Sequence, residues 1–133
     1  MSIKGSSYAW FRRAIEADNA LLAWTSAQEI GRLAHLEDSV ALVLCISRSD
    51  PRRYKASCDR LLVRLQQAVP LSFDQRERIR LVLAALPSDE QARAAALVDL
   101  EQALEGTGLT ACARTVGAYR DRLPAGGAGK TNG

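Results

Sequence analysis

The sequence predicts an all-α protein, folded as a compact bundle or a short solenoid of about six to seven antiparallel helices. Composition is the first reason: 47% of the 133 residues are hydrophobic and only 5% are aromatic, so Leu, Ala, Val and Ile must build the core. Patterning is the second, because no segment alternates apolar and polar residues over the length of a strand. Third, Pro, Gly and capping residues divide the chain into segments of helical length.

The first two helices are expected at residues 7–17 and from about 21 to near Gly31. In the first segment Trp10 and Phe11 share the apolar side of the helix with smaller residues, so both rings are expected to anchor the core. Asp18-Asn19 supplies a cap for the second helix, and Gly31 can end it because glycine readily adopts a positive φ. The two segments are expected to form a helical hairpin.

The third and fourth helices are expected at about 36–46 and 51–69. Residues 40–46 are apolar on every face, which predicts a central, buried helix. Asp50 and Pro51 form a strong helix start, and Pro70 ends the segment. The apolar stripe of the fourth helix consists of Tyr54, Cys58, Leu61, Leu62, Leu65 and Val69.

The remaining helices are expected at 73–86, 89–105 and 109–123. Ser72 with Gln75, and Ser88 with Gln91, each match a capping box, in which two side chains satisfy free backbone amides reciprocally. The segments between Ser72 and Gly106 are therefore well delimited, whereas Gly117 weakens the last helix.

Residues 1–123 are expected to form one helical domain, followed by a disordered tail at 124–133. The tail holds four glycines and no large apolar residue, a composition that does not support a core. Residues 126–131, Gly-Gly-Ala-Gly-Lys-Thr, look like the end of a phosphate-binding loop. Such a loop needs a strand before it and a helix after it, and the sequence offers neither.

The sequence predicts a cytoplasmic protein without a membrane span. No segment approaches the roughly 18 apolar residues that a span requires, and the first residues lack the apolar core of a secretory signal. Cys45, Cys58 and Cys112 are odd in number and widely spaced, so we expect reduced core residues and no disulfides.

The titratable residues form no recognisable catalytic or metal-binding pattern. His35 is the only histidine and falls in a connection between two helices, which favours a turn residue over a metal ligand or a catalytic base. Glu37 and Asp38 are interpreted as first-turn acids that complement a helix N-terminus. The sequence therefore predicts no enzyme, no cofactor and no metal.

Charge is distributed unevenly along the chain. The net charge is +3, but residues 48–80 hold nine basic and four acidic side chains, whereas 81–105 hold one basic and five acidic. Five arginines are expected to form an outward basic face on the helices at 51–69 and 73–86. These candidate partner-binding residues are Arg53, Arg60, Arg64, Arg76 and Arg80.

The basic face has two functional interpretations and one purely structural one. Arginine forks suit carboxylates and phosphates, so the partner could be an acidic protein surface or a nucleic acid. The structural interpretation is a solvated face, paired in part with the acidic helix that follows, and this is what runs of charge usually are. Tyr54 is predicted to turn inward, which weakens base stacking.

Residues 36–44, Leu-Glu-Asp-Ser-Val-Ala-Leu-Val-Leu, followed by Asp50-Pro51-Arg52-Arg53-Tyr54 and the leucines at 61–65, resemble a family of small uncharacterised all-helical proteins from actinobacteria. The resemblance covers about residues 14–86. It implies an all-helical fold and a bacterial cytoplasmic origin, and the family carries no assigned activity.

From these observations we expect a non-catalytic helical interaction module. Its partner is expected to be another protein or a second copy of the chain. The alternative is a nucleic-acid-associated protein that uses the arginine face of the helices at 51–69 and 73–86.

Overall fold

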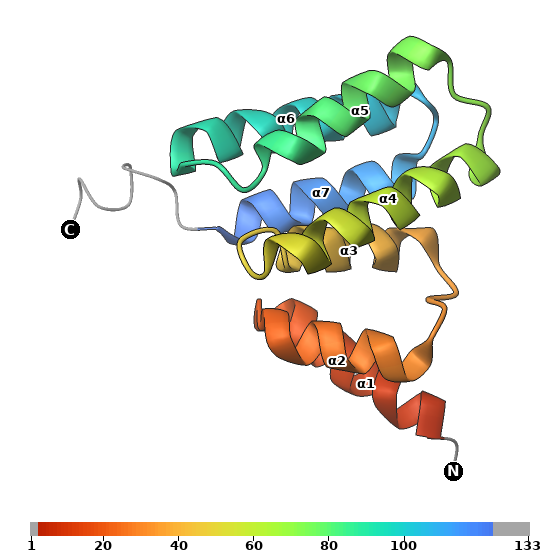
Figure 1. Ribbon diagram of the computed structural model, residues 1–133, viewed down its shortest axis with the longest axis vertical. Helices are drawn as coiled ribbons and strands as arrows, with labels where there is room; N and C mark the ends of the chain where they lie inside the picture. The colour runs from red at the N-terminus through yellow and green to blue at the C-terminus, as the bar shows by residue number, and fades with distance from the viewer. Residues whose placement is uncertain (1–2, 124–133) are drawn as a thin grey trace. The chain divides into compact units, whose positions relative to one another are not determined.

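The computed structural model describes residues 3–123, which form seven α-helices and no strand. Figure 1 follows them from red to blue. The predicted all-α fold is confirmed. The helices are α1 (Ile3–Glu16), α2 (Ala20–Ile30), α3 (Leu36–Cys45), α4 (Pro51–Ala68), α5 (Phe73–Ala85), α6 (Glu90–Gly106) and α7 (Thr110–Arg122).

Backbone contacts divide the chain into two compact units, Met1–Arg64 and Leu65–Gly133. The division falls inside α4, so one helix contributes residues to both units. The single domain expected from the sequence stays a prediction, as does the choice between a closed bundle and a solenoid. The expected tail and the Gly126–Thr131 segment lie outside the described residues.

Several helix boundaries are set by local signals in the sequence. Asn19 caps α2 by accepting a hydrogen bond from the Leu22 amide at 3.1 Å, and Gly31 ends it with φ +86°. The Asp50 carboxylate accepts a bond from the Arg52 amide at 2.8 Å. Both bonds of the predicted capping box are present at Ser72 and Gln75.

The second predicted capping box is wrong by one residue. Asp89, not Ser88, caps α6, because its carboxylate accepts a bond from the Ala92 amide at 2.9 Å. Aspartate and serine are about equally favourable as N-cap residues. A Ser-Asp pair alone therefore does not determine which of the two caps the helix. Gln91 therefore falls in the first turn without the partner that the box requires.

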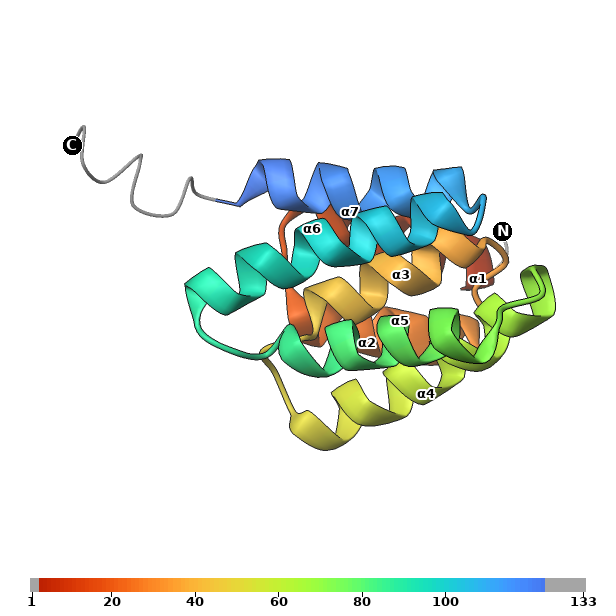
Figure 2. The ribbon, with the colours of Figure 1, turned by 90° about the horizontal axis from the view of Figure 1, so that it is seen from above.

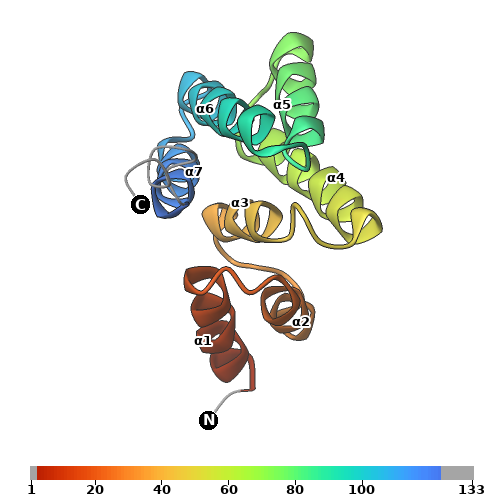
Figure 3. The ribbon, with the colours of Figure 1, turned by 90° about the vertical axis from the view of Figure 1, so that its left-hand side faces the viewer.

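The first unit is built on the α1–α2 hairpin, with α3 packed beside both helices, as Figure 3 shows. The hairpin prediction is confirmed. Phe11 is fully buried, and every residue from Val40 to Ser47 is buried, in agreement with the apolar character of α3 on all faces. Each large apolar side chain in this core contributes roughly 1.5–3 kcal/mol.

Trp10 does not anchor the core, contrary to the sequence prediction. Its side chain is 51% exposed, and the Arg13 guanidinium lies 5.3 Å from the ring centre. The buried stripe of α1 runs through Ser7, Phe11 and Ala14. Trp10 lies at the edge of that stripe, where about half of its side chain is exposed to solvent.

In the second unit α5 and α6 run antiparallel as neighbours, and α7 packs against α6 (Figure 2). Its core includes Leu97, Leu100 and Leu104 of α6, together with Ile79 and Leu83 of α5 and Val116 of α7. Arg93 lies within this core, 5% exposed, and donates to the Leu86 carbonyl at 3.0 Å and to the Tyr119 hydroxyl at 2.5 Å. It thereby joins the end of α5 to α7, since carbonyls at a helix end lack helical partners.

Candidate interaction surface

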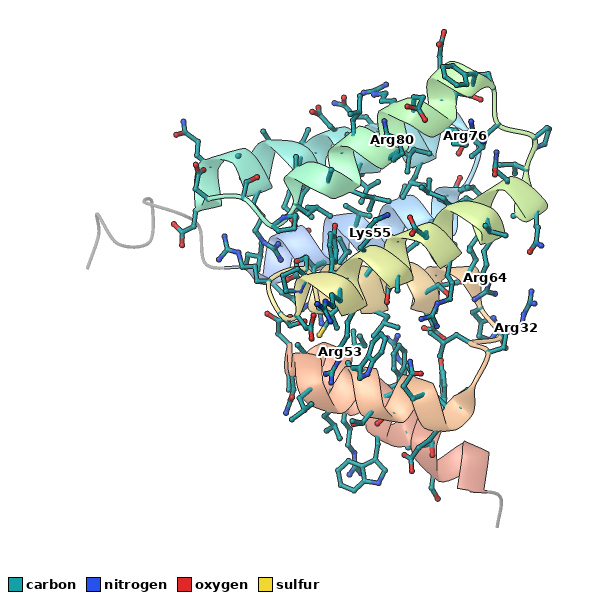
Figure 4. All side chains as sticks on the ribbon, in the orientation of Figure 1. Arg32, Arg53, Lys55, Arg64, Arg76 and Arg80 are labelled. Atoms are coloured by element: carbon teal, nitrogen blue, oxygen red, sulfur yellow. The ribbon has the colours of Figure 1, made fainter. Side chains whose placement is uncertain are left out.

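The predicted arginines of α4 lie on one side of the helix but have different surroundings. Figure 4 shows Arg53 and Arg64 on this helix. The Arg53 guanidinium lies 5.4 Å from the centre of the Trp24 ring and within 3.9 Å of the Asp50 carboxylate. Arg64 is half-buried and donates to the Ser39 hydroxyl. Two of the three arginines thus also contribute to packing within the first unit.

Arg60 is the exception on α4. It is exposed, and it makes no ion pair with any residue between 3 and 123. Of the α4 arginines that the sequence singled out, it matches most closely the expectation of an outward, available charge.

The two predicted arginines of α5 lie in the second unit, on one side of their helix (Figure 4). Arg80 makes a two-pronged ion pair with Glu77, at 2.7 Å for the shortest contact. This ion pair lowers the pKa of Glu77 and raises that of Arg80. The guanidinium of Arg76 lies 5.6 Å from the centre of the Phe73 ring.

The α5 helix also presents large apolar side chains, which the charge pattern of the sequence does not indicate. Phe73 is 68% exposed and Leu81 is 59% exposed. Leu81 lies two residues from buried Ile79 and two from buried Leu83, so its side chain points away from the core. Two features of the sequence indicate that these side chains are exposed. Leu81 is offset by two residues from the buried positions, and Phe73 directly follows the Ser72 cap.

The outward side of α6 differs from that of α5, because its exposed apolar side chains are smaller and its exposed charges are mainly acidic. Val98 is 38% exposed and lies two residues from buried Ala96 and Leu100. Small, exposed Ala94 and Ala95 occupy the turn before it. The exposed charges that follow on this helix, Asp99 and Glu105, are both acidic.

One polar cluster lies inside the first unit, around the Asp38 carboxylate. Asp38 is 3% exposed and accepts bonds from the Tyr8 hydroxyl and the Arg12 guanidinium, both at 2.9 Å. Burial and the bond to Asp38 raise the pKa of Tyr8. Asp38 does occupy the first turn of α3, as predicted, but it also connects α3 to α1.

The three cysteines and His35 have the surroundings that the sequence predicted. Cys45, Cys58 and Cys112 are free and buried, and burial raises the pKa of the Cys58 thiol to about 11. His35 is exposed at the start of α3. Within residues 3–123, His, Cys, Asp and Glu side chains form no group of three that could hold a metal ion.

Comparison of the chain with protein families, with curated proteins and with solved structures finds no match. None of the helices at residues 3–123 is long and apolar enough to cross a membrane.

Proposed function

We propose that the chain is a non-catalytic helical interaction module that binds a protein partner in the bacterial cytoplasm. The observation that supports this most directly is the outward side of α5, where Phe73 and Leu81 are largely exposed. They lie eight residues apart, or about 12 Å along the helix. Two exposed anchors at this spacing suit a partner that lays an apolar helix face against them.

The arginines of α5 indicate the chemistry of that partner. Arg76 and Arg80 lie beside Phe73 and Glu77, and Arg78 is exposed on the same helix. Carboxylates of a partner can replace Glu77 in its ion pair with Arg80, or accept hydrogen bonds from other N–H groups of the guanidinium groups. The proposed partner is therefore an acidic amphipathic helix, and its apolar residues would supply most of the binding energy.

Site-specific photo-cross-linking in the native host tests this proposal. A benzophenone amino acid replaces Leu81 in one variant and Val63, an exposed apolar residue of α4, in the matched control. The expected result is a protein adduct at position 81 that is absent or much weaker at position 63. Equal adduct formation at both positions, or none at position 81, contradicts the proposal.

Binding of a nucleic acid is the second candidate, and exposed Arg60 is the observation that favours it. Phosphate contacts weaken steeply with salt, so gel shifts at low ionic strength are the sensitive test. The expected signature is a shift that Arg60→Glu reduces and that rising salt abolishes. An unshifted probe at low salt would eliminate this candidate.

A further inference from the structure

The α5–α6 pair of the second unit carries two unlike outward faces side by side. The outward face of α5 has large apolar side chains, Phe73 and Leu81, with arginines near them. The outward face of α6 has small or medium apolar side chains, Ala94, Ala95 and Val98, with carboxylates near them. The two helices are antiparallel neighbours (Figure 2).

The positions of these residues along the helices also correspond. Leu81 lies four residues before the end of α5 at Ala85, and Ala94 lies four residues after the start of α6 at Glu90. Because a short turn joins the two helices, Leu81 is level with Ala94 and Ala95. A two-fold rotation about an axis parallel to the helices keeps these levels and exchanges α5 with α6.

We propose that the partner of this face is a second copy of the chain, with α5 of each copy packed on α6 of the other. This inference rests on the proposed function and names its partner. Leu81 of one copy then inserts over the alanines of the other, where small side chains let the helices approach closely. The same contact occurs twice, as two-fold symmetry requires.

Charge favours this arrangement over α5 packed on α5. The exposed carboxylates of α6 at Asp99 and Glu105 have no ion pair within residues 3–123. Arg78 of α5 is likewise exposed without an ion pair in that part of the chain. At the levels given above, packing α5 on α6 places Arg78 of one copy almost level with Asp99 of the other, whereas Glu105 lies beyond the start of α5. Packing like on like would instead bring each set of charges against itself.

The size of the face indicates a weak dimer. Helices of 13 and 17 residues are about 20 and 25 Å long, and two adjacent helices are about 20 Å wide. This footprint is on the order of 500 Å², below the roughly 800 Å² per partner of standard stable interfaces. Association is therefore expected to depend on concentration in the micromolar to millimolar range.

Sedimentation of the purified full chain from about 1 µM to about 1 mM tests the proposal. The expected result is a reversible shift from 14.4 kDa to twice that mass. Phe73→Ala/Leu81→Ala is expected to abolish the shift, whereas Leu21→Ala, which removes an exposed leucine of α2, leaves it unchanged. Circular dichroism checks that each variant retains its helices.

Charge reversal identifies the paired faces. One variant carries Arg78→Glu, and the other carries Asp99→Arg. Each alone is expected to be monomeric, because both symmetric contacts then join like charges. An equimolar mixture is expected to form the heterodimer, seen by native mass spectrometry, because both of its contacts join opposite charges. Arg52→Glu, an exposed reversal on α4, is the control and should dimerise normally.

The outcomes separate this inference from the proposed function. Four results would each contradict the two-fold α5–α6 dimer. The wild-type chain could stay monomeric at 1 mM, or form open polymers. The charge-reversed variants could still dimerise alone, or their mixture could fail to form the heterodimer. If the cross-link at position 81 then captures a different protein, the proposed function stands and only the identity of its partner changes. If that cross-link captures nothing, both fail.

Discussion

At the scale of single residues, the Asp38 carboxylate is the main polar connection between α1 and α3. It accepts one neutral and one charge-assisted hydrogen bond while almost fully buried. Of its two donors, the Arg12 side chain is 43% exposed, so its charge can return to water when the carboxylate is removed. The cost of that removal is therefore moderate.

We expect Asp38→Ala to lower the free energy of unfolding by about 2 kcal/mol, the loss of one charge-assisted and one neutral hydrogen bond less the resolvation of their donors. Urea titration followed by circular dichroism measures this value. Asp59→Ala, which removes an exposed ion pair with Lys55, should cost about 0.5 kcal/mol or less. Equal losses in the two variants would contradict the role given to Asp38.

The Cys58 thiol makes stability depend on alkaline pH. Its pKa rises from 9.0 to about 11 because it is buried. The neutral thiol therefore contributes stability that is complete below about pH 9 and is lost as pH rises towards 11. The advantage of the wild type over Cys58→Ala should shrink between about pH 8 and pH 10.5 in urea titrations. A constant difference would show that the thiol does not ionise on unfolding.

At the scale of helices, the sequence predicted boundaries better than surroundings. The cap at Ser72 and the end at Gly31 depend on residues within one turn, so they can be recognised locally. The partners of Asp38 are 26 and 30 residues away, and no local pattern indicates them. The exposure of Trp10 differs from the prediction for a similar reason, because periodicity indicates which side of a helix is apolar but not which residues on that side a neighbouring helix contacts.

The candidate interaction surface shows the same difference between features that can be predicted locally and features that depend on tertiary contacts. The arginines were found because charge is visible in a sequence, but the contacts of Arg53 with Trp24 and of Arg64 with Ser39 are tertiary. The exposure of Phe73 and Leu81 could not be predicted in the same way, because residue type alone does not distinguish an exposed apolar residue from a buried one.

The packing of α6 on α7 gives a prediction at this scale. A Cβ added at Gly117 would lie 2.8 Å from the Glu101 carboxylate, which is paired with Arg120. Alanine is usually better than glycine inside a helix by about 1 kcal/mol. We therefore expect Gly117→Ala to stabilise the Glu101→Ala variant by about that amount and the wild type by less, because there the carboxylate must move.

A double-mutant cycle from thermal or urea unfolding measures the difference between the two backgrounds. Equal effects in both would show that Glu101 yields to the added methyl group without cost. Gly117 would then be present for reasons other than this contact.

At the scale of the whole molecule, 133 residues suggested one domain, whereas backbone contacts are concentrated in two units. Asp38→Ala can distinguish these alternatives in the intact chain. If the units unfold separately, amide exchange should accelerate within residues 3–64, up to about 30-fold for about 2 kcal/mol. Exchange within 65–123 should stay unchanged. Equal acceleration in both parts, measured by mass spectrometry, would indicate one cooperative domain.

The two tryptophans of the chain, Trp10 and Trp24, both belong to the first unit, each beside an arginine of that unit. Fluorescence excited through tryptophan therefore reports on residues 1–64 and does not directly detect unfolding of α5, α6 and α7. Far-ultraviolet circular dichroism detects every helix. Tryptophan fluorescence is therefore an intrinsic probe of the first unit alone. A difference between the melting temperatures measured by fluorescence and by circular dichroism would show that the two units differ in stability.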